Sequence, residues 1–150
     1  HFSETSTNSV DYLIKQYPLN IQTRGRSTEE LTTKINQFIR QSGVKDGLCH
    51  TFVQHTSASL MVTENADSDV RRDLENFITT LVLDGDPVYL HDQEGPDDMA
   101  AHIRSVLTQT DITIPITAGK LALGTWQGIY LWEHRTHPHL RQLFITISGE

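Results

Sequence analysis

The sequence predicts a single α+β domain in which about three helices lie among mostly antiparallel strands. Its 150 residues are the usual length of one domain, and a chain of this size can bury one sizeable core. Apolar residues recur at helical spacing in three segments, whereas short apolar segments separated by glycines dominate the end of the chain. Because strands and helices do not alternate regularly, this pattern favours α+β over a doubly wound parallel sheet.

The first half of this domain contains an edge strand, a helix and two buried strands. The edge strand is expected over residues 12–21, interrupted or bent near Pro18. Hydroxyl and acidic residues at 27–30 are expected to cap a helix that ends near residues 42–43. Two apolar segments then predict strands that pair with each other around a short polar connector, residues 55–58. These two strands are expected at residues 47–54 and 59–63.

The second half is expected to contain two helices and the closing strands. One helix begins after an N-cap at Asp67 and ends near Val82. An exposed acidic loop follows at residues 91–98, and a third helix carries His102. The closing strands are expected at residues 112–116, 121–123, 129–132 and 143–147.

Composition excludes several classes of function. With 12 basic and 19 acidic residues and a formal charge of −7, the chain is not expected to bind nucleic acid, although a local basic pocket for a small anion is compatible with it. No apolar run approaches the roughly 20 residues of a membrane-spanning helix. The single cysteine, Cys49, is expected to pack as a small hydrophobe, and a lone thiol suits the cytoplasm. Residues 1–10 are interpreted as a flexible tail or an expression remnant, and residues 11–150 as the domain.

Eight histidines fall mainly into three groups that could carry chemistry. His55 lies in a connector rich in hydroxyl groups, which could cradle an anion or supply a metal ligand. His91 and His102 flank a run of carboxylates that could orient two imidazole ligands. The third group, residues 133–139, includes Arg135, whose guanidinium suits a phosphorylated substrate.

Each group also has a purely structural interpretation. The connector could be a hydrogen-bonded turn, the acidic loop a solvated cap on a helix, and Arg135 a member of a surface ion pair. Trp126, between Gly124 and Gly128, could line a ligand site or pack in the core. Motifs for nucleotide cradles and nucleophile elbows do not occur in the sequence.

Taken together and in order, these groups resemble the YjbQ family, also called the secondary thiamine-phosphate synthase family. The likeness covers nearly all of residues 11–150. The matching motifs are His55-Thr56-Ser57-Ala58-Ser59-Leu60, Glu64-Asn65, Tyr89-Leu90-His91 with Glu94-Gly95, Asp97-Asp98 and Ala101-His102, and Leu123-Gly124-Thr125-Trp126-Gln127-Gly128 followed by Glu133-His134-Arg135.

The resemblance implies an α+β fold that assembles as a homotrimer and binds a divalent metal, most often zinc, near a subunit interface. His55, His91 and His102 are the ligands that it implies. Many relatives have an acidic segment containing Gly and Pro where this chain has residues 133–137, so no role is transferred to His134 or His137.

The family's name implies a transferase that joins a pyrimidine diphosphate to a thiazole phosphate, giving thiamine phosphate and pyrophosphate. The metal and Arg135 would stabilise the charge of the departing pyrophosphate. The same resemblance implies roles for two further sets of residues. Glu64, Asn65 and Gln127 would orient the substrate, and Thr56, Ser57, Thr125 and Trp126 would bind the substrate or its anionic groups.

Two other functions are compatible with these residues. A metal-dependent hydrolase would hold an activated water at an open coordination position. A non-catalytic trimer would use the metal, or its pocket, to bind a small molecule or to assemble. Three imidazoles with carboxylates nearby also admit nickel, iron or manganese in place of zinc.

Overall fold

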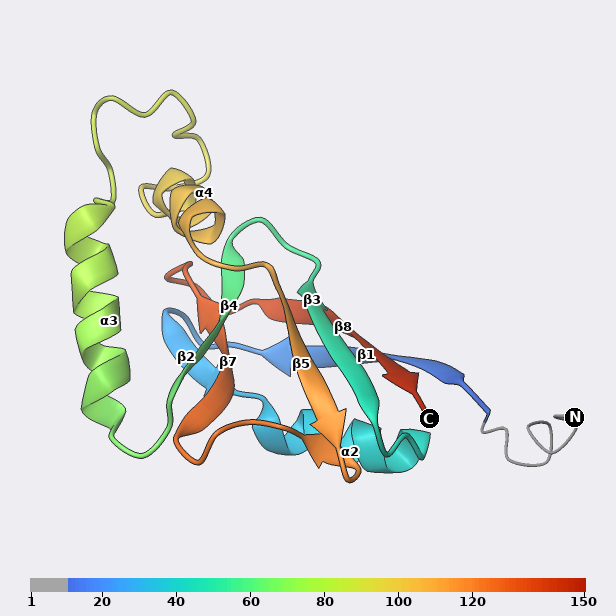
Figure 1. Cartoon of the computed structure of the whole chain (residues 1–150). Coiled ribbons are helices and arrows are strands. Elements are labelled where there is room, and N and C mark those ends of the chain that lie inside the picture. Colours follow the sequence, from blue (N-terminus) through green and yellow to red (C-terminus); the bar gives the residue numbers. More distant parts are fainter. Residues whose placement is uncertain (1–10) are drawn as a thin grey trace, which may run out of the picture.

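A computed structural model describes residues 11–150 (Figure 1), and the expected N-terminal tail lies outside the described residues. The strands form two sheets, one of five strands in the order β1-β8-β3-β5-β6 and one of three in the order β2-β7-β4. Every pairing between these strands is antiparallel. The predicted α+β class is therefore confirmed.

The helices and strands agree with most of the predicted segments. The strands and helices in chain order are β1 (Leu13–Gln22), β2 (Ser27–Glu30), α2 (Thr32–Ser42), β3 (Gly47–Val53), β4 (Ala58–Glu64), α3 (Ser68–Leu81), α4 (Asp98–Leu107), β5 (Asp111–Thr117), β6 (Lys120–Leu121), β7 (Gln127–Glu133) and β8 (Leu140–Gly149). None of the helices in this part of the chain has the length and apolar character needed to cross a membrane.

The main core fills the space between the two sheets and α2. From β8, Leu143, Ile145 and Ile147 point into it and are fully buried, as the alternation of that strand requires. The α2 side chains Ile35 and Ile39 belong to the same apolar cluster. Cys49 on β3 also lies in this cluster, where burial raises the pKa of its thiol to about 12. The prediction that Cys49 packs as a small hydrophobe is confirmed.

The three-stranded sheet is covered on both faces. Leu131 of β7 faces the main core, whereas its neighbours Tyr130 and Trp132 face a second apolar cluster. That cluster also contains Ile78 of α3 and Ala100 of α4. Both helices therefore form a further layer outside this sheet, and in Figure 1 they stand beside β4 and β7. The layer fixes α4, which carries the candidate site.

Two expectations about the first half of the chain are wrong. Residues 27–30 do not cap a helix, because their backbone pairs with β7 as strand β2, and α2 begins one residue after the buried Leu31. Strands β3 and β4 do not pair with each other: β3 lies between β5 and β8, and β4 pairs with β7 in the other sheet. The connector between them therefore crosses from one sheet to the other.

The predicted edge position of the first strand is confirmed, but the strand is continuous through Pro18. Strand β1 pairs only with β8, so alternate N–H groups of β1 face away from any neighbour. A proline can occupy such a position without removing a hydrogen bond from the ladder.

Two isoleucines in the same sheet allow a matched test of this core. Ile145 is fully buried, whereas Ile14 on β1 is 65% exposed. We expect Ile145→Ala to lower the free energy of unfolding by about 2–5 kcal/mol, because it removes buried methyl groups and leaves a cavity. The control Ile14→Ala should change it by about 0.5 kcal/mol or less. Equal losses in urea denaturation of the two variants would contradict this placement of the core.

Candidate metal centre

The first turn of α4 forms the centre of the candidate site. Gly95 has a positive φ of 102°, and this conformation turns the chain toward the start of the helix. Asp98 and His102 lie four residues apart on α4, so both side chains lie on one face. His91, from the preceding loop, reaches the same carboxylate.

Three ligand atoms converge at this point. Asp98 Oδ2 lies 2.6 Å from His91 Nε2 and 3.2 Å from His102 Nε2. One ligand atom from each of the three residues lies within 4.8 Å of the other two. Ligands of a tetrahedral zinc ion, with bonds of about 2.0–2.2 Å, lie roughly 3.3 Å from one another. The residues therefore fit a small divalent cation after only a slight adjustment.

A backbone carbonyl fixes the proton on His102. Its Nδ1 lies 3.1 Å from the carbonyl oxygen of Thr56, which can only accept, so Nδ1 carries hydrogen and donates it. In the neutral ring, Nε2 then carries a lone pair instead of a hydrogen, and it faces Asp98 Oδ2 at 3.2 Å. Two acceptors at this distance require a positive species, either a second proton or a metal cation. Such a carbonyl contact is also the usual way in which proteins orient a metal-binding histidine.

Arg135 holds the carboxylates of this site in place. Its Nη1 donates to Asp98 Oδ1 and its Nε to Asp97 Oδ2, both at 2.8 Å. Its Nη2 donates to the carbonyl of Glu94 at 3.0 Å. All three nitrogens are therefore used within the protein. In this arrangement Arg135 orients the acidic residues, and a contact of its guanidinium with a substrate phosphate stays a prediction.

The two aspartates are buried and remain ionised. Each is only 3% exposed, so the expectation of an exposed loop over residues 91–98 is wrong at its end. Burial alone would raise the pKa of Asp98, but the hydrogen bond from His91, the charge of His102 when that ring is protonated, and the charge of Arg135 lower it overall. For Asp97, burial is likewise outweighed by hydrogen bonds from Thr136 N–H and Arg135, and the pKa falls well below its usual range.

A buried ion pair between Glu133 and Arg141 holds the residues around the site in place. Arg141 of β8 binds both carboxylate oxygens of Glu133 at the end of β7, with an Nε to Oε1 distance of 2.7 Å. Glu133 Oε2 accepts the backbone N–H of Arg135 at 3.0 Å. Arg141 also donates to the carbonyl and the hydroxyl of Ser57, at 3.2 and 3.0 Å. The pair thus fixes both Arg135 and the connector whose Thr56 carbonyl orients His102.

His55 does not belong to the converging group. Its Nε2 accepts the backbone N–H of Gln142 at 2.8 Å. Burial and the nearby Arg141 lower its pKa, which keeps the ring neutral. His55 and His102 nevertheless line one hollow of about 380 Å³ together with Thr56 and Thr108. That His55 binds metal stays a prediction.

The remaining predicted residues gather at the other end of β4. Asn65 N–H donates to the Trp126 carbonyl at 3.0 Å, and Asn65 Nδ2 donates to the Gln127 carbonyl at 3.3 Å. Glu64 accepts two backbone N–H groups at the start of α3. Thr125 is exposed next to Trp126. Since β4 spans seven residues, this group lies roughly 20 Å from the histidines within one chain.

Sequence reasoning underestimated four residues. Asp98 was expected only as an outer acceptor, although its spacing of four residues from His102 on a predicted helix is a signal that both share one face. Glu133 and Arg141 gave no such signal, because nothing in their strands predicts that two different sheets bring them together. His134, in a turn where histidines are usually exposed, is fully buried.

Comparison with known proteins gives one consistent family. The family described as "UPF0047 protein YjbQ-like" matches residues 17–150. A UPF0047 protein of Synechocystis is 53% identical over 132 residues, which are 88% of this chain and 90% of the relative. The UPF0047 protein YjbQ of Escherichia coli O157:H7 is 42% identical over 90% of this chain and 98% of its own length.

Solved structures agree with this result. A hypothetical protein from Aeropyrum pernix superposes with a TM-score of 0.82 at 28% identity, over 91% of this chain and 99% of the other. A yjbq/upf0047 family protein from Clostridium acetobutylicum has a TM-score of 0.77 at 34% identity, over 89% of this chain and 98% of the other.

The buried His134 makes stability depend on pH. Its Nε2 lies 2.8 Å from Ser59 Oγ, while its Nδ1 has no partner among the described residues. Burial, together with the charges of Arg104, Arg26 and Arg141, lowers its pKa from 6.5 to about 3. Between these values only the unfolded chain binds this proton, so its contribution is complete above about pH 6.5 and is lost as the pH falls toward 3.

We expect the metal-stripped protein to lose about 2 kcal/mol of unfolding free energy from this residue between about pH 7 and pH 5. The variant His134→Gln keeps a donor for Ser59 and should show a correspondingly smaller loss over the same range. Urea denaturation at several pH values measures both. Parallel pH profiles for the two proteins would contradict a neutral, buried His134.

Proposed function

Because the chain belongs to the UPF0047 (YjbQ-like) family, we propose that it is a metal-dependent enzyme whose divalent ion is bound by His91, Asp98 and His102. The observation that supports this proposal is the fixed Nδ1–H of His102, which leaves Nε2 and Asp98 Oδ2 as two acceptors facing each other. Two imidazoles and one carboxylate suit zinc. Zinc is the metal that we propose.

The ion would act on a small phosphorylated metabolite, and the thiamine-phosphate reaction is the best named candidate. In that reaction the thiazole nitrogen attacks the pyrimidine methylene carbon, and the bond from this carbon to the diphosphate oxygen breaks. A bound divalent ion would neutralise the charge that develops on the leaving pyrophosphate. The hollow beside His102, with hydroxyls from Thr56 and Thr108, offers space and hydrogen bonds for the substrate.

The chain's own residues would prepare this site before any substrate binds. Thr56 holds the proton of His102 on Nδ1, and Arg135 keeps Asp98 oriented and ionised. His55 lines the same hollow, and its Nε2 would become a further ligand only by releasing the backbone N–H of Gln142 that it accepts. Arg135 would support the ion by orienting the Asp98 carboxylate.

We also propose that the protein works as a homotrimer whose subunits complete each other's sites. The two groups of predicted residues lie at opposite ends of β4 in one chain, and each adjoins large exposed apolar side chains. Leu90 beside His91 is 97% exposed, and Trp126 beside Gln127 is 63% exposed. An interface between copies would cover these side chains and bring both groups together. The buried thiol of Cys49 suits a location in the cytoplasm.

Metal binding tests the first proposal. His91→Ala and His102→Ala should each weaken zinc binding by about tenfold to a thousandfold, because each removes one ligand, whereas loss of His55 will show whether it is a further ligand. The matched control is His50→Ala, which removes a half-buried histidine 2.9 Å from Asp111 that belongs to no group of three ligands in residues 11–150. Competition with a chromophoric chelator gives the affinities. Unchanged affinity in both site variants would refute the centre.

Mixed subunits test the second proposal. His91→Ala and Glu64→Ala should each abolish release of pyrophosphate when assayed alone. If sites form between subunits, refolding the two variants together should restore about one quarter of the wild-type rate, as random assembly predicts. Light scattering should give a trimer mass for all samples. No recovery in mixed trimers would place both residues in one subunit's site or in separate sites.

A further inference from the structure

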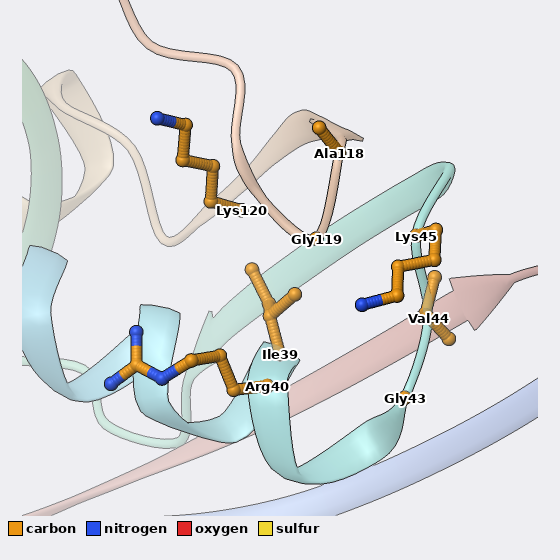
Figure 2. Close-up of a pocket in the computed structure, with 8 residues that line it drawn as sticks. All are labelled: Ile39, Arg40, Gly43, Val44, Lys45, Ala118, Gly119 and Lys120. Atoms are coloured by element: carbon orange, nitrogen blue, oxygen red, sulfur yellow. The ribbon is translucent and has the colours of Figure 1, made fainter.

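A basic hollow lies far from the histidine site, at the end of α2. Its walls are the last turn of α2, the loop leading to β3 and the β5–β6 hairpin, and its volume is about 450 Å³. In Figure 1 these segments lie at the opposite end of the molecule from α4. Figure 2 shows Arg40, Lys45 and Lys120 on three sides of the opening, each from a different segment.

The charges of this hollow are unbalanced. No acidic residue lines it, and none of the three cations forms a salt bridge with a described residue. This is unusual in a chain with a formal charge of −7. A second hollow that also contains arginines differs, because Glu75 lines it and its Arg26 pairs with Asp84 at 2.6 Å. Of these two hollows, the first is lined by basic residues without an acidic one.

The hollow is held open by backbone contacts. Gly119 N–H donates to the Lys45 carbonyl at 3.0 Å, which ties the hairpin to the loop after α2. Leu121 N–H donates to Asn36 Oδ1 at 2.9 Å, which ties the same hairpin to the helix. Ala118 and Gly119 both have positive φ, at 54° and 79°, as a tight two-residue hairpin requires. A ligand would therefore meet preformed walls.

A simpler explanation accounts for only one of the cations. The carbonyl end of a helix attracts positive charge, and Arg40 lies in the last turn of α2. Lys45 and Lys120 belong to the loop and to β6, and yet they face the same space. Helix capping does not explain why three segments each contribute a cation.

We propose that this hollow binds a small, multiply charged phosphate compound. An arginine and two lysines can contact the oxygens of a phosphoryl group from three sides, which suits a compact anion with two or more charges. The hollow is also lined by Ile39 and Val44, whose side chains belong to the buried main core beneath it. This site is separate from the histidine centre and does not depend on its proposed function.

Titration with inorganic pyrophosphate, followed by calorimetry, tests the proposal. The wild-type protein should bind saturably, and added salt should weaken the binding. Lys45→Gln and Lys120→Gln should each raise the dissociation constant by about tenfold or more, since each removes a charge-assisted hydrogen bond. The matched control is Lys34→Gln, an exposed lysine on the same helix that does not line the hollow. It should bind like the wild type.

Two further measurements separate this site from the histidine centre. The double variant His91→Ala, His102→Ala should retain the binding, because it leaves the basic hollow intact. Amide resonances of Gly43 and Gly119 should shift on titration of the wild-type protein, a result that does not depend on how any variant folds. Absence of saturable binding, or binding that survives Lys45→Gln and Lys120→Gln together, or binding lost with the two histidines, would overturn the proposal.

Discussion

The arrangement of the whole site depends on one buried ion pair. Glu133 ends a strand of the three-stranded sheet and Arg141 lies near the start of a strand of the five-stranded sheet, so their pairing joins the two sheets. Thr23, just after β1, donates to the same carboxylate at 2.6 Å. Burying two charges is costly unless their hydrogen bonds are satisfied, and removing one partner of such a pair typically costs about 3–5 kcal/mol. Here each oxygen of Glu133 accepts two hydrogen bonds, and Arg141 donates from Nε and Nη2.

Hydrogen bonds connect this pair to the histidine centre along two routes. One branch runs from Glu133 through Arg135 to Asp98, and the other from Arg141 through the Ser57 connector to the carbonyl that orients His102. The centre is therefore preorganised by groups that never touch it. Preorganisation of this kind lets an ion or substrate bind without first having to order the side chains around it.

The sequence predicted individual elements better than their partners. Amphipathic spacing located α3 and α4 and the closing strands, because each of these segments buries a face with a clear period. It failed at residues 27–30, where pairing with β7 overrode a local capping pattern, and at β3 and β4, which are neighbours in the chain but not in a sheet. The sequence identified His91 and His102 as candidate ligands. It did not identify Arg141, because the partner of Arg141 is set by how the two sheets pack.

The topology has a consequence for how the polypeptide is made. Within residues 11–150, strand β1 has a single neighbour, β8, and Leu13 lies opposite Gly149. Strand β1 must therefore wait, unpaired, until β8 has been synthesised and has left the ribosome. Closing so long a loop is slow, and the waiting strand is open to pairing with other chains. Pro18 within that strand has no backbone N–H to donate, which makes pairing of this strand with other chains less favourable.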